Sequence, residues 1–201
     1  MRRVDTKLTR SLPALGSSLP GDASHRLFVA LRLPPSWAAA LAVWQDGAFG
    51  AVAGVRIVPP EQLHITLAFL GERSAGELPL IAGAVREAAT AVVGPLRLTP
   101  ARYCETRSVG LLVLDDKAGA AAALAGAVQG RLASLGVYRQ ERGSWLPHVT
   151  VLRFRARPEL RPGVPPIGPC LPSDAALYHS SLRSGGAQYV IVDSVALGGT
   201  H

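Results

Sequence analysis

The feature that most constrains the fold of this chain is a four-residue pattern, His-x-Thr-x, that occurs twice. The first tetrad is His64–Leu67 (HITL) and the second, 84 residues later, is His148–Val151 (HVTV). Each tetrad begins a short apolar run of the strand type, and each follows a proline and a segment with helical spacing. A pattern repeated in this way predicts two lobes of similar design that face each other, each contributing one tetrad.

The rest of the chain mixes short strand-like runs with three helical segments. Strand-like runs, rich in β-branched and aromatic residues, occupy 26–33, 55–58, 63–70, 96–104, 109–114, 147–154, 176–182 and 189–196. Helical spacing is found at 36–44, 78–93 and 118–135, with Gly136 placed to cap the last helix. Because strands outnumber helices and successive strands are close enough to pair, the pattern predicts an α+β fold with largely antiparallel sheet.

Length and composition leave room for one folded domain and exclude several classes of protein. The 201 residues are 48% hydrophobic and 17% charged, which is usual for a packed globular chain. No apolar stretch reaches the roughly 18 residues that a membrane-spanning helix needs. Two cysteines are too few for a disulfide scaffold and favour a cytoplasmic protein. We expect residues 1–24 to form a flexible N-terminal extension and 25–201 to form a single domain.

The charge balance of the chain favours a polyanionic partner. Lys and Arg number 21 against 14 Asp and Glu, a formal net charge of +7, and such an excess suits nucleic acid. Residues 131–161, which surround the second tetrad, carry seven arginines against two glutamates. A basic face here would attract an RNA backbone through counterion release, whereas scattered solvated charges would not.

The residue types in the tetrads are suited to cleaving a phosphodiester. Alternation in a strand places His64 and Thr66 on one face, and His148 and Thr150 likewise, with the apolar residues of each tetrad on the other face. One neutral imidazole can take a proton from an attacking water while one imidazolium gives a proton to the leaving oxygen. Threonine hydroxyls can donate to the phosphate oxygens on which charge develops. The sequence therefore predicts a two-histidine acid–base site.

The two tetrads resemble the paired signatures of the 2H phosphoesterase superfamily. Within it, the chain is most similar to the RNA 2′,3′-cyclic phosphodiesterases, also called 2′-5′ RNA ligases, of the LigT/ThpR type. The resemblance extends to 26–31 (RLFVAL), 138–142 (YRQER) and the closing segment 177–189, and covers about residues 26–198. It implies a bilobal α+β fold with two largely antiparallel sheets, flanking helices, a pseudo-twofold axis and a central cleft.

The resemblance also implies an activity and roles for the tetrad residues. The activity is metal-independent hydrolysis of RNA 2′,3′-cyclic phosphate ends to 2′-phosphates, with 2′-5′ ligation as the reverse reaction and no cofactor. By this analogy His64 is the proton donor, His148 is the proton acceptor, and Thr66 and Thr150 hold the phosphate. Spacing alone leaves open which histidine is the acid. We expect a monomer that acts on RNA without a membrane or an obligate protein partner.

Two further residues are candidates for substrate binding. Arg153 lies five residues after His148 and could pair with phosphate. Strict strand alternation places it on the opposite face, which a strand end or a bulge after Val151 would correct. Phe28, in the first strand-like run, could stack on a base or belong to the core.

Other functions make different demands on the sequence. A zinc hydrolase needs three or four ligands at suitable spacing, and neither tetrad has a second ligand at metal-binding spacing. P-loop and G-x-S-x-G patterns do not occur in the sequence. Two alternatives remain: a non-catalytic basic RNA-binding module, and a 2H phosphodiesterase that acts on small cyclic nucleotides.

Overall fold

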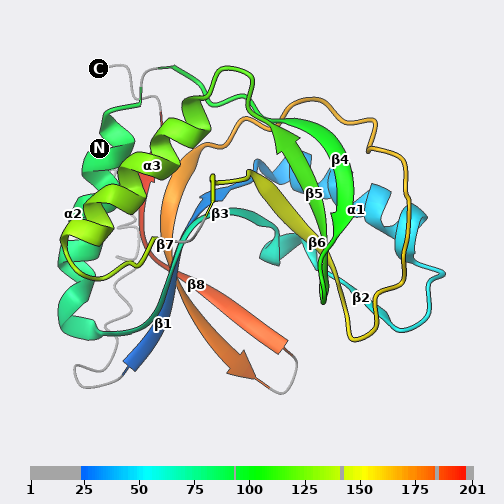
Figure 1. Cartoon of the computed structure of the whole chain (residues 1–201), viewed down its shortest axis with the longest axis horizontal. Helices are drawn as coiled ribbons and strands as arrows, with labels where there is room; N and C mark the ends of the chain where they lie inside the picture. Colours follow the sequence, from blue (N-terminus) through cyan, green and yellow to red (C-terminus); the bar gives the residue numbers. More distant parts are fainter. Residues whose placement is uncertain (1–23, 93, 141–142, 184–185, 198–201) are drawn as a thin grey trace, which may run out of the picture.

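The computed structural model describes residues 24–92, 94–140, 143–183 and 186–197, and its elements follow the predicted order (Figure 1). The strands are β1 (Ser24–Arg32), β2 (Val55–Ile57), β3 (His64–Ser74), β4 (Thr99–Glu105), β5 (Val109–Asp115), β6 (His148–Phe154), β7 (Asp174–Arg183) and β8 (Gly186–Ala196). The helices are α1 (Pro35–Phe49), α2 (Leu78–Thr90), α3 (Ala120–Ser134) and the short 3-10 turns η1 (Pro60–Gln62) and η2 (Ala75–Glu77). Residues 1–23 of the predicted extension lie outside the described residues, and Ser24, its last residue, begins β1.

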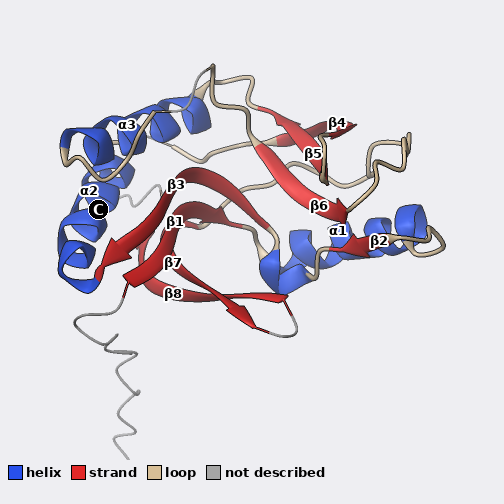
Figure 2. Ribbon diagram, turned by 60° about the horizontal axis from the view of Figure 1, so that its bottom comes forward, coloured by secondary structure: helices blue, strands red, loops and turns tan. Residues whose placement is uncertain are grey.

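The strands form a curled sheet in which every pairing among the described residues is antiparallel (Figure 2). The strand order is β4-β5-β6-β3-β1-β7-β8, and β2 pairs with β6. The predicted α+β, antiparallel architecture is confirmed, with one correction. Two sheets were expected, but the strands form one sheet. Its two halves join where β3 meets β6 at the pair Ile65–Val149.

Helices α1 and α3 each pack on the half of the sheet that contains the tetrad of the other half of the chain. α2 and α3 pack on each other, α3 contacts β3, and α2 contacts β7 and β8, whereas α1 contacts β2 and lies with the half that contains β5 and β6 (Figures 1 and 2). The helix that precedes the first tetrad in the chain therefore packs beside the strand of the second, and α3 does the reverse. No helix in the described part of the chain is long and apolar enough to span a membrane.

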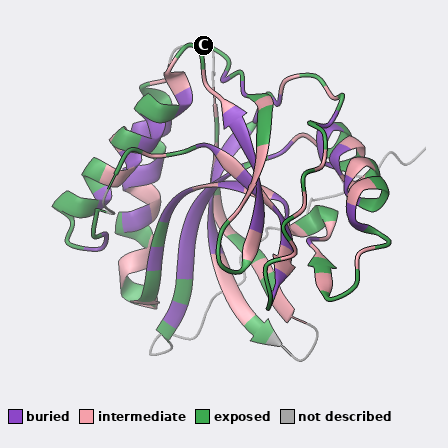
Figure 3. Ribbon diagram, turned by 45° about the vertical axis from the view of Figure 1, so that its right-hand side comes forward, coloured by how far each residue is buried: buried purple, intermediate pink, exposed green. Residues whose placement is uncertain are grey.

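The main core lies between the helices and the apolar face of the tetrad strands (Figure 3). Ile65 and Val149 are fully buried on this face. α3, although rich in Ala and Gly, supplies a matching apolar stripe because its buried residues recur every three or four positions: Ala121, Leu124, Ala125, Val128 and Leu132. The chain leaves α3 through Gly136 at φ 71°, the left-handed conformation that ends helices and that the sequence predicted here.

α1 and β3 extend four or five residues beyond their predicted C-terminal ends because tertiary contacts continue them. α1 runs five residues past the predicted end at Trp44, because Gln45 and Phe49 are buried against the sheet. β3 was expected to stop before Gly71, but it continues through this glycine, at φ 69°, to Ser74. Its pairing with β1 reaches Ser24–Ser74, so the sheet ladder outweighs the turn preference of glycine.

Candidate active site

All six residues singled out in the sequence line one cleft where the two halves of the sheet meet. The cleft has a volume of about 430 Å³, and its lining includes His64, Thr66, His148, Thr150, Arg153 and Phe28. β3 and β6 bring the tetrads together by crossing at Ile65–Val149, which hold equivalent positions in the two tetrads. Because the crossing is antiparallel, His64 lies on the side of Thr150 and Thr66 on the side of His148. The two imidazoles are therefore on opposite sides of a pseudo-twofold axis.

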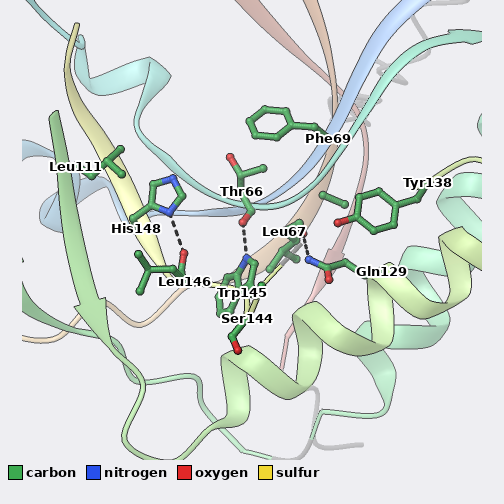
Figure 4. Close-up of a pocket in the computed structure, with 12 residues that line it drawn as sticks. Thr66, Leu67, Phe69, Leu111, Gln129, Tyr138, Ser144, Trp145, Leu146 and His148 are labelled. Carbon is green, nitrogen blue, oxygen red and sulfur yellow. Dashed lines mark hydrogen bonds between the residues drawn. The ribbon is translucent and has the colours of Figure 1, made fainter. Parts of the chain in front are cut away.

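Both histidines are oriented by the same local contact. The Nδ1 atom of His64 lies 2.7 Å from the carbonyl oxygen of Gln62. Nδ1 of His148 lies 2.8 Å from the carbonyl oxygen of Leu146, as Figure 4 shows. A carbonyl oxygen can only accept a hydrogen bond, so Nδ1 must carry the proton in both rings. The Nε2 atom of each ring is left to accept a proton when neutral or to donate one when protonated.

Each tetrad ends in a β-bulge at its fourth residue. On β3, Thr66 pairs with Ala30 and Ala68 with Val29, so Leu67 is the extra residue. On β6, Thr150 pairs with Leu111 and Leu152 with Gly110, so Val151 is the extra residue. A bulge places two consecutive residues on the same side of a strand, and the residues around both bulges show it in two consecutive buried positions. The side chains beyond each bulge return to the cleft face.

The bulge at Val151 accounts for the position of Arg153. Strict alternation would place this residue opposite His148, but the inserted residue returns it to the cleft, where it lines the cavity. The same geometry on β3 returns Phe69, five residues after His64, to the cleft. Phe69 is 58% exposed. The sequence reasoning missed it, although its spacing from His64 equals that of Arg153 from His148.

His64 lies against a group of aromatic rings that His148 lacks among its described contacts. Its ring centroid is 4.9 Å from that of Phe28 and 5.4 Å from that of Tyr189. Phe28 is stacked on Tyr178 with centroids 4.8 Å apart and an interplanar angle of 6°, and it is only 4% exposed. The candidate base-stacking residue therefore packs beside the imidazole, whereas Phe69 presents the exposed ring.

These surroundings weaken the basicity of His64. Burial lowers the pKa of His64 from 6.5 to about 4, because an imidazolium loses hydration there. The hydrogen bond to Gln62 opposes this change, and the electrostatic interactions with Arg153 and His148 add to it. In the free protein His64 is therefore neutral at pH 7.

Arginines from both halves of the sheet make the cleft electropositive. Arg26 of β1 and Arg56 of β2 line it together with Arg153, and none of the ion pairs between described residues involves these three. Arg56 was not predicted, because it reaches the cleft only through the pairing of β2 with β6, opposite Arg153.

The basic segment 131–161 contributes less to the cleft than its composition suggests. Arg131 is paired with Glu87 at 2.6 Å, and Arg157 is paired with Glu105 at 3.2 Å. The positive charge of the cleft therefore comes from several strands and not from this segment alone.

A second cavity of about 200 Å³ adjoins the cleft and shares Thr66, Phe69 and His148 with it (Figure 4). Tyr138 and Trp145 also line this cavity. The indole Nε1 of Trp145 donates to the carbonyl oxygen of Thr66 at 2.9 Å. The loop before β6 is thus tied to the first tetrad, and the two tetrad regions are mechanically connected.

The cleft offers proton-transfer and hydrogen-bonding groups. No group of three His, Cys, Asp or Glu side chains that could hold a metal ion is found within residues 24–92, 94–140, 143–183 and 186–197. Two imidazoles, two hydroxyls and three guanidinium groups can together bind an anionic phosphate and exchange protons with it.

Comparisons with known proteins agree with this geometry. Residues 31–98, which contain the first tetrad, match the family model of LigT-like phosphoesterases. The RNA 2′,3′-cyclic phosphodiesterase of Escherichia coli (strain K12) is 31% identical over 180 residues, covering 86% of this chain and 97% of that protein.

Solved structures show the same fold over nearly their whole length. A crystal structure of a Thermus thermophilus protein matches with a TM-score of 0.71 and 29% identity, covering 88% of this chain and all of that one. E. coli LigT complexed with 3′-AMP matches with a TM-score of 0.72 and 26% identity, covering 87% and 99% of the two chains. The identity to the E. coli enzyme, the coverage and the shared fold show that this chain belongs to the LigT-like family of 2H phosphoesterases.

Proposed function

We propose that this protein hydrolyses RNA ends that carry a 2′,3′-cyclic phosphate and leaves a 2′-phosphomonoester, without a metal ion. The observation that carries the proposal is the convergence of two Nδ1-anchored histidines, from opposite sides, on one arginine-lined cleft. The name and the complexes of the related E. coli enzyme support the same substrate class. At the same site a 5′-hydroxyl could take the place of water: its oxygen would bond to phosphorus as the bond to the 3′ oxygen breaks, which leaves a 2′-5′ linkage.

In the proposed mechanism the two histidines act on opposite sides of phosphorus. Nε2 of neutral His148 takes a proton from water as the water oxygen bonds to phosphorus. The bond from phosphorus to the 3′ oxygen breaks, and this oxygen receives a proton from Nε2 of His64. The phosphate stays on the 2′ oxygen. Hydroxyls of Thr66 and Thr150 donate to the non-bridging oxygens, where negative charge increases in the transition state.

His64 needs the substrate to become an acid. Its pKa of about 4 in the free protein leaves it deprotonated at neutral pH, whereas a bound phosphate anion stabilises the imidazolium and raises the pKa. The enzyme would then acquire its general acid only when the phosphate is in place. The pH dependence of kcat, which reports the complex, should therefore differ from that of kcat/KM, which reports the free enzyme.

The arginines of the cleft favour RNA over small cyclic nucleotides as substrate. A cyclic phosphate carries one negative charge, whereas Arg26, Arg56 and Arg153 present three positive charges to the cleft. Guanidinium groups beyond the reacting phosphate can bind the preceding phosphates of an RNA chain. Cleavage of a short RNA should accordingly show a higher kcat/KM than cleavage of 2′,3′-cyclic AMP, and a reversed ratio would make the small nucleotide the better candidate.

We infer a monomer that works in the cytoplasm with no obligate protein partner.

A product assay tests the proposal directly. A short RNA ending in a 2′,3′-cyclic phosphate is incubated with the protein in EDTA, and chromatography resolves the cyclic, 2′-phosphate and 3′-phosphate forms. We expect the 2′-phosphate. A dominant 3′-phosphate would overturn the assigned seating of the ribose and the roles of the histidines. Loss of activity in EDTA that Zn²⁺ or Mn²⁺ restores would overturn the metal-independent mechanism, and binding without turnover would favour an RNA-binding module.

A further inference from the structure

Two glutamines, one on each of two helices, contact the bulges that end the tetrads. Nε2 of Gln129, on α3, donates to the carbonyl oxygen of Leu67 at 2.8 Å (Figure 4). Nε2 of Gln45, on α1, donates to the carbonyl oxygen of Val151 at 2.7 Å and to that of Val58 at 3.1 Å. Leu67 and Val151 are the extra residues of the two bulges.

The two contacts repeat with the symmetry of the tetrads. Gln45 and Gln129 are 84 residues apart, as are His64 and His148. Each glutamine holds the tetrad that belongs to the other half of the chain, because the helices cross over. In both halves the glutamine donates to the carbonyl oxygen of the extra residue of the bulge. This recurrence argues against incidental packing.

Apolar packing alone does not explain why a glutamine occupies position 45. Its side chain is fully buried, and its Oε1 atom has no hydrogen-bond partner among the described residues. An unsatisfied buried amide oxygen is unfavourable for stability. A methionine would fill similar space without that penalty, so the benefit of the glutamine must come from the groups that its Nε2 holds.

The bulge sets which side chains enter the cleft. The histidine and threonine of each tetrad lie just before it, and Arg153 or Phe69 lies two residues after it. A bulge that shifts or relaxes would turn these side chains relative to the phosphate. Displacement of reacting groups by about an ångström can lower a rate about 100-fold.

We propose that Gln45 and Gln129 are positioning residues, each of which fixes the bulge of one tetrad and thereby the side chains that the bulge directs into the cleft. Gln129 acts on the half that carries His64, Thr66 and Phe69. Gln45 acts on the half that carries His148, Thr150 and Arg153. For its kinetic effect this inference rests on the proposed two-histidine function.

The test replaces each glutamine by methionine, which keeps the length of the side chain and removes the donor. Gln129→Met is the main variant because this side chain is only half-buried, and Gln45→Met is its counterpart in the core. Gln188→Met is the matched control. Gln188 is exposed on β8 and lies between Ala187 and Tyr189, which line the cleft, so it faces away.

The first readout needs no substrate. The Cε1 protons of His64 and His148 are followed by NMR through a pH titration. Gln129→Met should change the chemical shift of the His64 proton more than that of the His148 proton, and Gln45→Met should do the opposite. Equal or absent changes in both variants, with the fold retained, would overturn the positioning role.

The second readout is turnover of the cyclic-phosphate RNA. Each variant should lower kcat about 10- to 100-fold with KM changed by less than about threefold, while Gln188→Met keeps both values. Wild-type kcat in Gln129→Met would overturn the proposal. If the wild-type protein has no phosphodiesterase activity, the proposed function fails, and the NMR titration still decides the positioning role. Should Gln45→Met not fold, Gln129→Met alone decides.

Discussion

The two tetrad regions have the same backbone construction but different surroundings. In both, a carbonyl oxygen two residues earlier holds Nδ1, and a bulge follows the threonine. Around His64, however, the rings of Phe28 and Tyr189 pack against the imidazole, and its contact with Gln62 is half-buried, whereas the contact of His148 with Leu146 is exposed to solvent. A two-histidine mechanism needs one acid and one base, and identical sites would titrate alike. The repeated geometry aims both imidazoles, and the surroundings of His64 keep it neutral until a bound phosphate favours its protonated form.

The largest effect on turnover is expected when one imidazole is removed at a time. His64→Ala and His148→Ala should each lower turnover by about 10²–10⁴-fold while the far-UV circular dichroism stays that of the wild type. The double variant should lose little more than either single one, because the two groups act as a unit. Turnover near the wild-type value in either single variant would mean that the two regions do not share one reaction.

The difference in burial should be visible in the pH dependence of stability. The pKa of His64 is about 4 in the folded protein against 6.5 for an ordinary histidine. Between these values the unfolded chain binds more protons, so the free energy of unfolding should fall as the pH drops from 6.5 to 4. The upper bound for this one group is about 3 kcal/mol.

Denaturant unfolding at several pH values measures this effect. His64→Asn should flatten the curve in that window, because asparagine can donate to Gln62 but does not titrate. The variant should therefore lose less free energy of unfolding between pH 6.5 and 4 than the wild type. An unchanged slope in His64→Asn would contradict the lowered pKa of His64.

Substitution of the residues five positions after the histidines should distinguish a contact with phosphate from stacking on a base. Arg153→Ala should lower kcat/KM about 10- to 100-fold, the loss expected for a charge-assisted contact with phosphate. Phe69→Ala should act chiefly on KM, by roughly tenfold, if its exposed ring stacks on a base. Steady-state kinetics on the RNA substrate distinguishes the two. Phe69→Leu serves as the control for apolar burial without an aromatic face.

The smallest expected effect concerns the arginines outside the tetrads. Arg56→Ala should weaken RNA binding and reduce the slope of log affinity against log salt by about 1, the share of one phosphate contact. Arg157→Ala should leave the slope nearly unchanged, because Arg157 is engaged by Glu105. Binding titrations from about 50 to 200 mM salt give both slopes. A larger change for Arg157 would relocate the RNA path toward residues 131–161.

Much of the fold could be predicted because the signals are local. Strand alternation in HITL and HVTV indicates which tetrad side chains share a face, and the stripe from Ala121 to Leu132 marks α3 despite its small residues. The site needed more than alternation. Arg153 enters the cleft only because Val151 of β6 has no partner residue on β5. Such a bulge depends on the register of a partner strand that is distant in sequence.

What the sequence by itself determined is the chemistry available: two histidines and two threonines at a fixed spacing in strands, and a basic chain around them. The tertiary structure decided how that chemistry differs between the two halves. Phe28 and Tyr189 reach His64 through β1 and β8, and Arg56 reaches the cleft through β2. The crossed helices bring Gln45 to Val151 and Gln129 to Leu67. The reason is physical: hydrogen-bond periodicity and side-chain alternation act between near neighbours in the chain. Burial, register and the field around a titrating group are set by segments that meet only when the sheet closes.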